Sequence, residues 1–172
     1  MDTNVLGLAR QAVEHYVHTH TLLPQPDSLP AELSSPLPVF VSLRVGDTLR
    51  GCIGTLMATK PTLAEEIIAN AVAAAVNDPR FPPVSAAELP TLSYEVDIVD
   101  PLERVPGEEE LDPARYGVVV ERDNRRGVLL PAIEGITSTK QQVAIARIKA
   151  DIAPEEPVTL YRFSVRRFRE GA

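Results

Sequence analysis

A hairpin of two apolar strands is the feature that most constrains the fold of this chain. Residues 39–45, Val-Phe-Val-Ser-Leu-Arg-Val, alternate in the manner of a half-buried strand. Gly46-Asp47 is typical of a tight turn, and Thr48 to Leu56 is predicted to return as the second strand. We therefore expect an antiparallel sheet built around this pair.

The returning strand carries Cys52, the only cysteine among the 172 residues. Side chains alternate between the two faces of a strand. Arg50, Cys52 and Gly54 are therefore expected on one face, and Leu49 and Ile53 on the other. This pattern predicts a core on one side of the hairpin and a small thiol-containing site on the other.

Hydrophobic periodicity, with Gly and Pro as stops, places the remaining elements. The predicted helices run from Val5 to about His20 (N-cap Thr3 or Asn4), from Pro61 to Asn77, and from Thr139 to Ala150 (N-cap Ser138). A proline-rich excursion, Thr21–Pro38, follows the first helix, and Ser85 and Glu88 form a candidate capping box. The further predictions are a strand from Leu92 to Ile98, a loop from Asp100 to Tyr116, a hairpin from Gly117 to Leu130, and a strand from Val158 to Val165.

These elements predict an α+β fold, an antiparallel sheet flanked by helices, in a single domain over residues 1–172 with room for a large and a small lobe. No stretch approaches the roughly 20 apolar residues of a membrane helix. The start of the chain does not resemble a signal peptide, and one cysteine cannot form an internal disulfide. We therefore expect a cytoplasmic protein that does not associate with membranes.

The net charge of −7 argues against a general nucleic-acid binder. The densest basic group is C-terminal and comprises Arg162, Arg166, Arg167 and Arg169. Such groups are most often solvated surface, and RNA contact is the second interpretation.

The hexapeptide Leu49-Arg50-Gly51-Cys52-Ile53-Gly54 resembles the signature of the AMMECR1 domain family. Supporting segments follow in the expected order: Asn70–Ala75, Asn77–Val84, Glu88-Leu89, Leu92–Val96, Gly127–Pro131 and Leu160–Phe163. The resemblance covers roughly residues 5 to 169. Asp151 departs from the pattern, because a glycine is expected there as a left-handed helix stop.

This resemblance implies an α+β domain whose hexapeptide lines a cleft. It also implies Memo-type and radical SAM proteins as partners, and a role in RNA modification or gene expression, although the family has no settled activity. Whether the chain is an enzyme therefore stays open at this point.

Cys52 is the central candidate for chemistry. A nearby cation lowers the pKa of a thiol, and Arg50 on the same strand face or Arg80 in the following turn supplies one. The arginines also suit a carboxylate or phosphate of a ligand. The alternative is that Cys52 is a small buried residue, as free cysteines often are.

Glu95 is the candidate acid or base, although an ion pair that orients Arg50 or Arg80 is the favoured interpretation. Gly51 and Gly54 would let a ligand approach the backbone closely. No histidine lies near Cys52 in sequence, and we expect no metal site and no cofactor.

Three hypotheses follow from these residues. The first is an enzyme or enzyme component whose cleft contains Cys52, Arg50, Arg80 and Glu95. The second is a non-catalytic module that binds RNA, a peptide or a partner enzyme. The third is purely structural, with Gly51 and Gly54 admitting a neighbouring helix.

Overall fold

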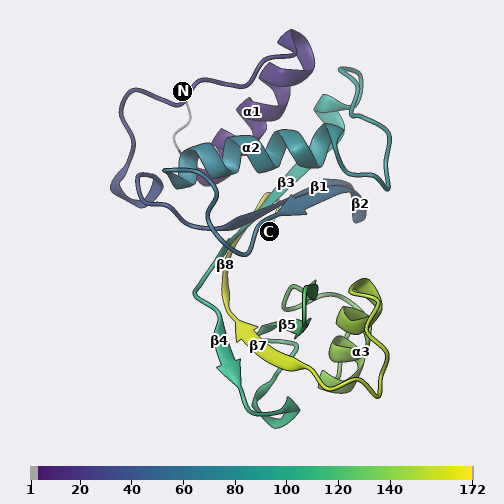
Figure 1. Ribbon diagram of the computed structural model, residues 1–172. Coiled ribbons are helices and arrows are strands. Elements are labelled where there is room, and N and C mark those ends of the chain that lie inside the picture. Colours follow the sequence, from purple (N-terminus) through teal and green to yellow (C-terminus); the bar gives the residue numbers. More distant parts are fainter. Residues whose placement is uncertain (1–3, 172) are drawn as a thin grey trace. The chain divides into compact units, whose positions relative to one another are not determined.

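The computed structural model describes residues 4–171 and confirms the α+β class (Figure 1). The chain divides into two compact units. The first unit holds the residues up to Val99 and those from Arg166 onward, and the second unit is Asp100–Val165. Each unit is built on an antiparallel four-stranded sheet, where the sequence had predicted one sheet. That both units fold as one domain stays a prediction.

The first sheet has the strand order β2-β1-β3-β8. Its strands are β1 (Val39–Val45), β2 (Thr48–Gly54), β3 (Leu92–Val99) and β8 (Val165–Arg169). Helices α1 (Val5–Thr19) and α2 (Leu63–Val76) pack on one face of this sheet (Figure 1). Val39, Val41 and Leu43 of β1 are fully buried beneath them.

The helix ends follow local hydrogen bonding. Asn4 caps α1 by accepting from the Gly7 N–H, and Thr3 lies outside the described residues. The predicted helical start at Pro61 is wrong, because the Thr62 side chain caps α2 and the helix begins at Leu63. The predicted end at Asn77 is confirmed.

The second sheet has the order β4-β7-β5-β6. Its elements are β4 (Glu103–Val105), β5 (Gly117–Arg122), β6 (Arg125–Leu129), α3 (Thr139–Lys149) and β7 (Thr159–Phe163). The predicted loop from Asp100 to Tyr116 is therefore wrong in part, since β4 pairs with β7 inside it. The predicted hairpin and the Ser138-capped helix are confirmed.

The last predicted strand is divided in the structure. Residues expected as one strand from Val158 to Val165 form β7, and β8 then runs on to Arg169 in the other sheet. Asp151 after α3 has φ 54°, so aspartate takes the left-handed position at which a glycine was expected.

Short 3₁₀ turns complete the chain: η1 (Ala31–Leu33), η2 (Leu89–Thr91) and η3 (Glu108–Glu110). Among the helices of residues 4–171, none has the length and apolar character that a membrane span requires.

Candidate functional site

Cys52 lies opposite Ser42 because the hairpin contains a register shift. A two-residue turn at Gly46-Asp47 pairs Val45 with Thr48, but the pairing shifts by one residue between Leu43 and Arg44. The Ser42 hydroxyl consequently donates to Cys52 Sγ over 3.2 Å. The cysteine is half-buried on β2, an edge strand of the first sheet.

The face that carries Cys52 is polar yet largely buried. Ser42 pairs with Glu95 of β3 as well as with Cys52, so the three residues form one row across the sheet. The next row along β3 contains Asp97. Ser42, Glu95 and Asp97 are 5%, 6% and 1% exposed. We call Cys52, Ser42, Glu95, Asp97 and Arg167 the cysteine face.

Arginines of β8 neutralise the two buried carboxylates. Arg167 donates to both oxygens of Asp97 at 2.8 Å and lies 3.7 Å from Glu95. Arg169 lies 3.5 Å from Glu95. The hydrogen bond to Asp97 is the main reason that the pKa of Arg167 is raised, and the charges of Glu95 and Cys52 contribute less. Arg167 is therefore within electrostatic reach of the thiol.

Asp78, after α2, joins Cys52 to Arg80. Its Oδ2 accepts from the Cys52 backbone N–H at 2.9 Å and from Arg80 Nη2 at 2.8 Å. Its Oδ1 accepts from the Arg80 backbone N–H and from Arg80 Nε. The hydrogen bond from Arg80 holds the pKa of Asp78 well below its usual range, against the opposing effect of burial. An edge-strand N–H that would otherwise face outward is thereby satisfied.

Arg50 belongs to a second ion pair. Its Nε and Nη2 donate to Glu88 at 2.7 and 3.3 Å, and Glu88 also accepts from Ser85 N–H and Oγ–H. Only half of the predicted capping box is present, because Glu88 accepts from the Ser85 N–H but the Glu88 N–H donates to the Ser85 carbonyl oxygen and not to its hydroxyl. Chiefly the hydrogen bond from Arg50 lowers the pKa of Glu88 to about 2. Arg50 and Arg80 both lie against the Phe81 ring, at 6.0 and 5.5 Å from its centroid.

Both candidate glycines have packing roles. A Cβ on Gly51 would come closer than 3.0 Å to the backbone oxygen of Ala74 in α2. A Cβ on Gly54 would overlap the ring of Phe40. Protein atoms therefore occupy the space that glycine provides at both positions. A helix fills it only at Gly51, as the structural hypothesis expected, whereas at Gly54 the neighbour is Phe40 of β1.

Four predicted side chains lie on β2 or on residues connected to it: Cys52, Arg50, Arg80 and Glu95. The ion-pair partners of the two arginines and of Glu95 differ from those expected. The expectation that Glu95 would orient Arg50 or Arg80 is wrong, because Glu88 and Asp78 hold those arginines. The sequence grouping had suggested that Arg167 and Arg169 are solvated surface residues. In the structure both form ion pairs, with Asp97 and Glu95 respectively.

The histidines lie apart from Cys52. His15 and His18 belong to α1 and His20 caps it, on the helix-covered side of the sheet. Cys52 lies on the other side, since its partner Ser42 alternates with the core residues Val41 and Leu43. Within residues 4–171, no three His, Cys, Asp or Glu side chains are grouped so as to hold a metal ion.

Sequence reasoning missed Ser42, Asp78 and Arg167. The register shift that places Ser42 beside Cys52 has no sequence signal. Asp78 precedes Pro79 and is typical of a turn after a helix, so its position gave no indication of a bond to β2. Val165 to Arg169 alternates between apolar and basic residues only in part, with Phe168 between Arg167 and Arg169. This pattern was the available signal that a strand extends past Val165.

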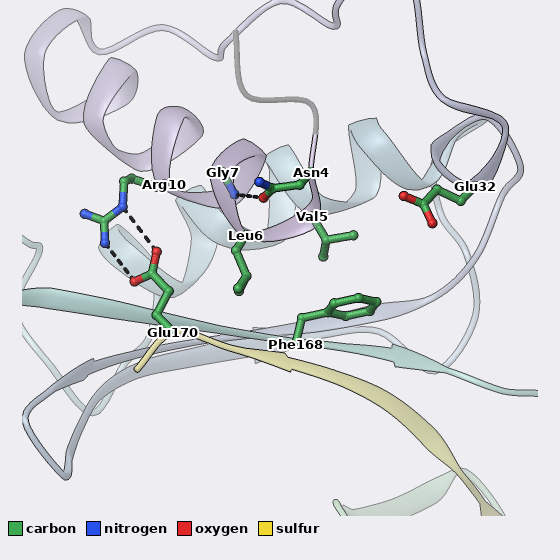
Figure 2. A pocket seen from close by; sticks show the side chains of 8 residues that line it. All are labelled: Asn4, Val5, Leu6, Gly7, Arg10, Glu32, Phe168 and Glu170. Carbon is green, nitrogen blue, oxygen red and sulfur yellow. Dashed lines mark hydrogen bonds and ion pairs between the residues drawn. The ribbon is translucent and has the colours of Figure 1, made fainter. Parts of the chain in front are cut away.

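A cavity of about 350 Å³ lies elsewhere in the first unit, between the first turn of α1 and β8 (Figure 2). Its lining residues are Asn4, Val5, Leu6, Gly7, Arg10, Glu32, Phe168 and Glu170. Arg10 and Glu170 are paired at 2.7 Å along one side. None of the predicted site residues lines this cavity.

The fold and the site define an α+β protein with two antiparallel sheets and a half-buried cysteine on an edge strand. The chain belongs to the AMMECR1 family, whose model matches residues 6–168. This confirms the resemblance drawn from the hexapeptide and its supporting segments.

Relatives extend over nearly the whole chain. A Thermotoga maritima protein is 46% identical over 164 residues, which cover 94% of each chain. A Clostridium acetobutylicum protein is 41% identical over 95% of this chain, but the match covers only 35% of that longer protein. The crystal structure of an uncharacterized Pyrococcus horikoshii protein superposes with a TM-score of 0.91 at 33% identity, covering 97% of this chain and 90% of that one.

Proposed function

We propose that this AMMECR1-family protein is an enzyme or enzyme component whose reaction takes place at Cys52. In this proposal Cys52 is the nucleophile or thiol acceptor. Glu95, which lies in the same row of the sheet on the far side of Ser42, is the acid or base. Arg80 and Arg50 bind the substrate. Gly51 and Gly54 support the strand that carries the thiol.

The hydrogen bond from Ser42 Oγ to Cys52 Sγ carries the proposal. A hydroxyl that donates to sulfur stabilises the charged thiolate, which is the reactive form. The cationic Arg80 and Arg167, which both lie within electrostatic reach of Cys52, act in the same direction. A cysteine that served only as an apolar core residue would be fully buried among apolar groups, whereas Cys52 is only half-buried and lies among charged groups.

The family resemblance supplies the context of this proposal. We place the reaction in RNA or small-molecule modification in the cytoplasm, with Memo-type and radical SAM proteins as partners. Copurification of these proteins with the chain tests the partnership, and its absence under conditions where all are expressed contradicts it.

Alkylation of the folded protein tests the role of Cys52. We expect iodoacetamide to modify Cys52 at about pH 6 to 7 faster than it modifies a small free thiol, since thiolate governs the rate. The Cys52→Ser variant controls for other nucleophiles. If the thiol reacts only when the protein unfolds, Cys52 is not the nucleophile.

A binding module is the second candidate function, favoured by the 56% exposure of the Arg80 side chain beside a half-buried thiol. It predicts that Arg50→Ala and Arg80→Ala abolish binding of RNA, peptide or partner, whereas Cys52→Ser leaves it intact. Equal loss in all three folded variants favours chemistry at the thiol instead.

A further inference from the structure

Asp78 is a buried carboxylate with more hydrogen bonds than a helix stop requires. Its side chain is 2% exposed, and one oxygen is shared between the Cys52 N–H and Arg80 Nη2. The other oxygen of Asp78 accepts hydrogen bonds from Arg80 Nε and from the Arg80 backbone N–H. Since only Pro79 separates the two residues, the orientation of the arginine is fixed locally, from its backbone to its guanidinium.

Arg80 faces outward from this anchor. Nε and Nη2 are bound to Asp78, whereas within residues 4–171 no acceptor meets Nη1. The side chain is 56% exposed, and the Phe81 ring supports the guanidinium at 5.5 Å. The ion pair therefore has a buried negative end and an exposed positive end. The exposed positive end is within electrostatic reach of Cys52, so it attracts an anion to the neighbourhood of the thiol.

We propose that Asp78 positions Arg80 so that its outward donors bind an oxyanion group, carboxylate or phosphate, of the molecule that reacts with Cys52. This inference rests on the proposed function and narrows its substrate class to anions. Guanidinium groups bind both kinds of oxyanion through parallel N–H donors. Arg50 is less suited to this role, since its side chain is only 13% exposed.

The preference of the Cys52 thiol for an anionic over a neutral alkylating reagent tests this inference. In alkylation the thiolate forms a carbon–sulfur bond and iodide leaves, with either the neutral iodoacetamide or the anionic iodoacetate as reagent. Both rates are proportional to the fraction of thiolate, so this fraction drops out of their ratio. The ratio therefore reports how strongly a nearby positive charge attracts the anionic reagent. It is measured for the wild type, Arg80→Gln, Asp78→Asn and the double variant, with Arg166→Gln as the control for net charge.

We expect Arg80→Gln to lower the preference for iodoacetate on the order of two- to fivefold, as for one exposed ion pair. Asp78→Asn keeps an acceptor for the Cys52 N–H, removes one negative charge and releases the guanidinium. The lost charge alone would raise the preference for iodoacetate, so a fall in this variant reports the loss of guanidinium positioning, and a fall is the expected result. The double variant should fall no further, and Arg166→Gln should change nothing. An unchanged ratio in Arg80→Gln, or additive losses in the double variant, overturns the inference.

A second measurement separates this inference from the proposed function. In the Cys52→Ser protein, inorganic phosphate and acetate are titrated while backbone amide NMR signals are followed. We expect saturable shifts at Arg80 and Phe81 with at least one of the two anions, and their loss in the Arg80→Gln background. The stronger of the two identifies the oxyanion. If an anion saturates the site but the wild-type thiol proves unreactive, only the role of Cys52 as a nucleophile is refuted. If neither anion produces a saturable shift, the anion site is refuted.

Discussion

Replacing Gly51 with alanine should destabilise the first unit through a clash with α2. The new Cβ would come under 3.0 Å from the Ala74 oxygen and 3.1 Å from its carbonyl carbon. Ordinary carbon contacts are about 3.5–4.0 Å, so strand and helix must separate by roughly 1 Å. Because the obstructing atoms are backbone, rotation of a side chain cannot relieve the contact.

The expected loss follows from this geometry. Overpacking a well-packed core costs about 1–3 kcal/mol. The surrounding helix residues Ala71, Ala74 and Ala75 are at most 2% exposed, which leaves little space for adjustment. Alanine recovers about 0.5–1 kcal/mol by restricting the unfolded chain. Because the clash is with backbone atoms, the upper end of the overpacking cost, about 3 kcal/mol, applies. Subtracting the gain leaves a net loss of about 2 kcal/mol, or roughly 4–8 °C in Tm for a chain of this size.

Urea denaturation followed by circular dichroism measures the change, with Gly46→Ala as the control. Gly46 has φ 58° and an open surrounding, so its alanine variant reports backbone strain without a clash. Ala74→Gly in the Gly51→Ala background should give no rescue, since the oxygen remains. Wild-type stability in Gly51→Ala, or full rescue by Ala74→Gly, refutes the reasoning.

Three further perturbations have defined outcomes. The pKa of Glu88 falls from 4.5 to about 2 on folding, so its stabilising effect is present above pH 4.5 and lost as pH falls to about 2; wild type and Glu88→Gln should converge in denaturation experiments over that interval, and a constant difference would contradict the ion pair. Glu66→Gln should cost about 1–3 kcal/mol and hasten proteolysis of residues 55–60, because the 1% exposed carboxylate accepts the Thr59 and Lys60 N–H groups through Oε2 and the Thr55 and Thr59 hydroxyls through Oε1, and an amide has an acceptor at only one of these positions; unchanged cleavage would refute this. Arg167→Ala should cost about 3–5 kcal/mol by leaving Asp97 charged and buried, while the exposed Arg166→Ala should stay near wild type by the same assay; equal effects would contradict the pairing.

Most helices and strands could be predicted from the sequence because their signals are local. The alternation from Leu92 to Ile98, the Ser138 cap and the Asn77 stop each depend on residues within a few positions of one another. The same reasoning missed β4, whose three residues form a strand only because β7 lies beside them.

The candidate site could be predicted only in part, since its partners are distant in sequence. Alternation placed Cys52 on a polar face, but the hydrogen bond to Ser42 depends on a register shift. Glu95 was assigned to nearby arginines, whereas its partners come from β8, some seventy residues later in the chain. A pairing of that kind is decided by sheet topology, which local patterns do not contain.

The order of residues in the first unit has a consequence for protein synthesis. The second unit is continuous in sequence, so all of its strands are synthesised before β8 of the first unit is complete. The first unit must wait for β8, so until then β3 lacks one neighbour and Asp97 lacks Arg167. A nascent chain halted before Arg166 would present an unpaired strand edge with a buried acid beside it, a state suited to chaperone capture or aggregation.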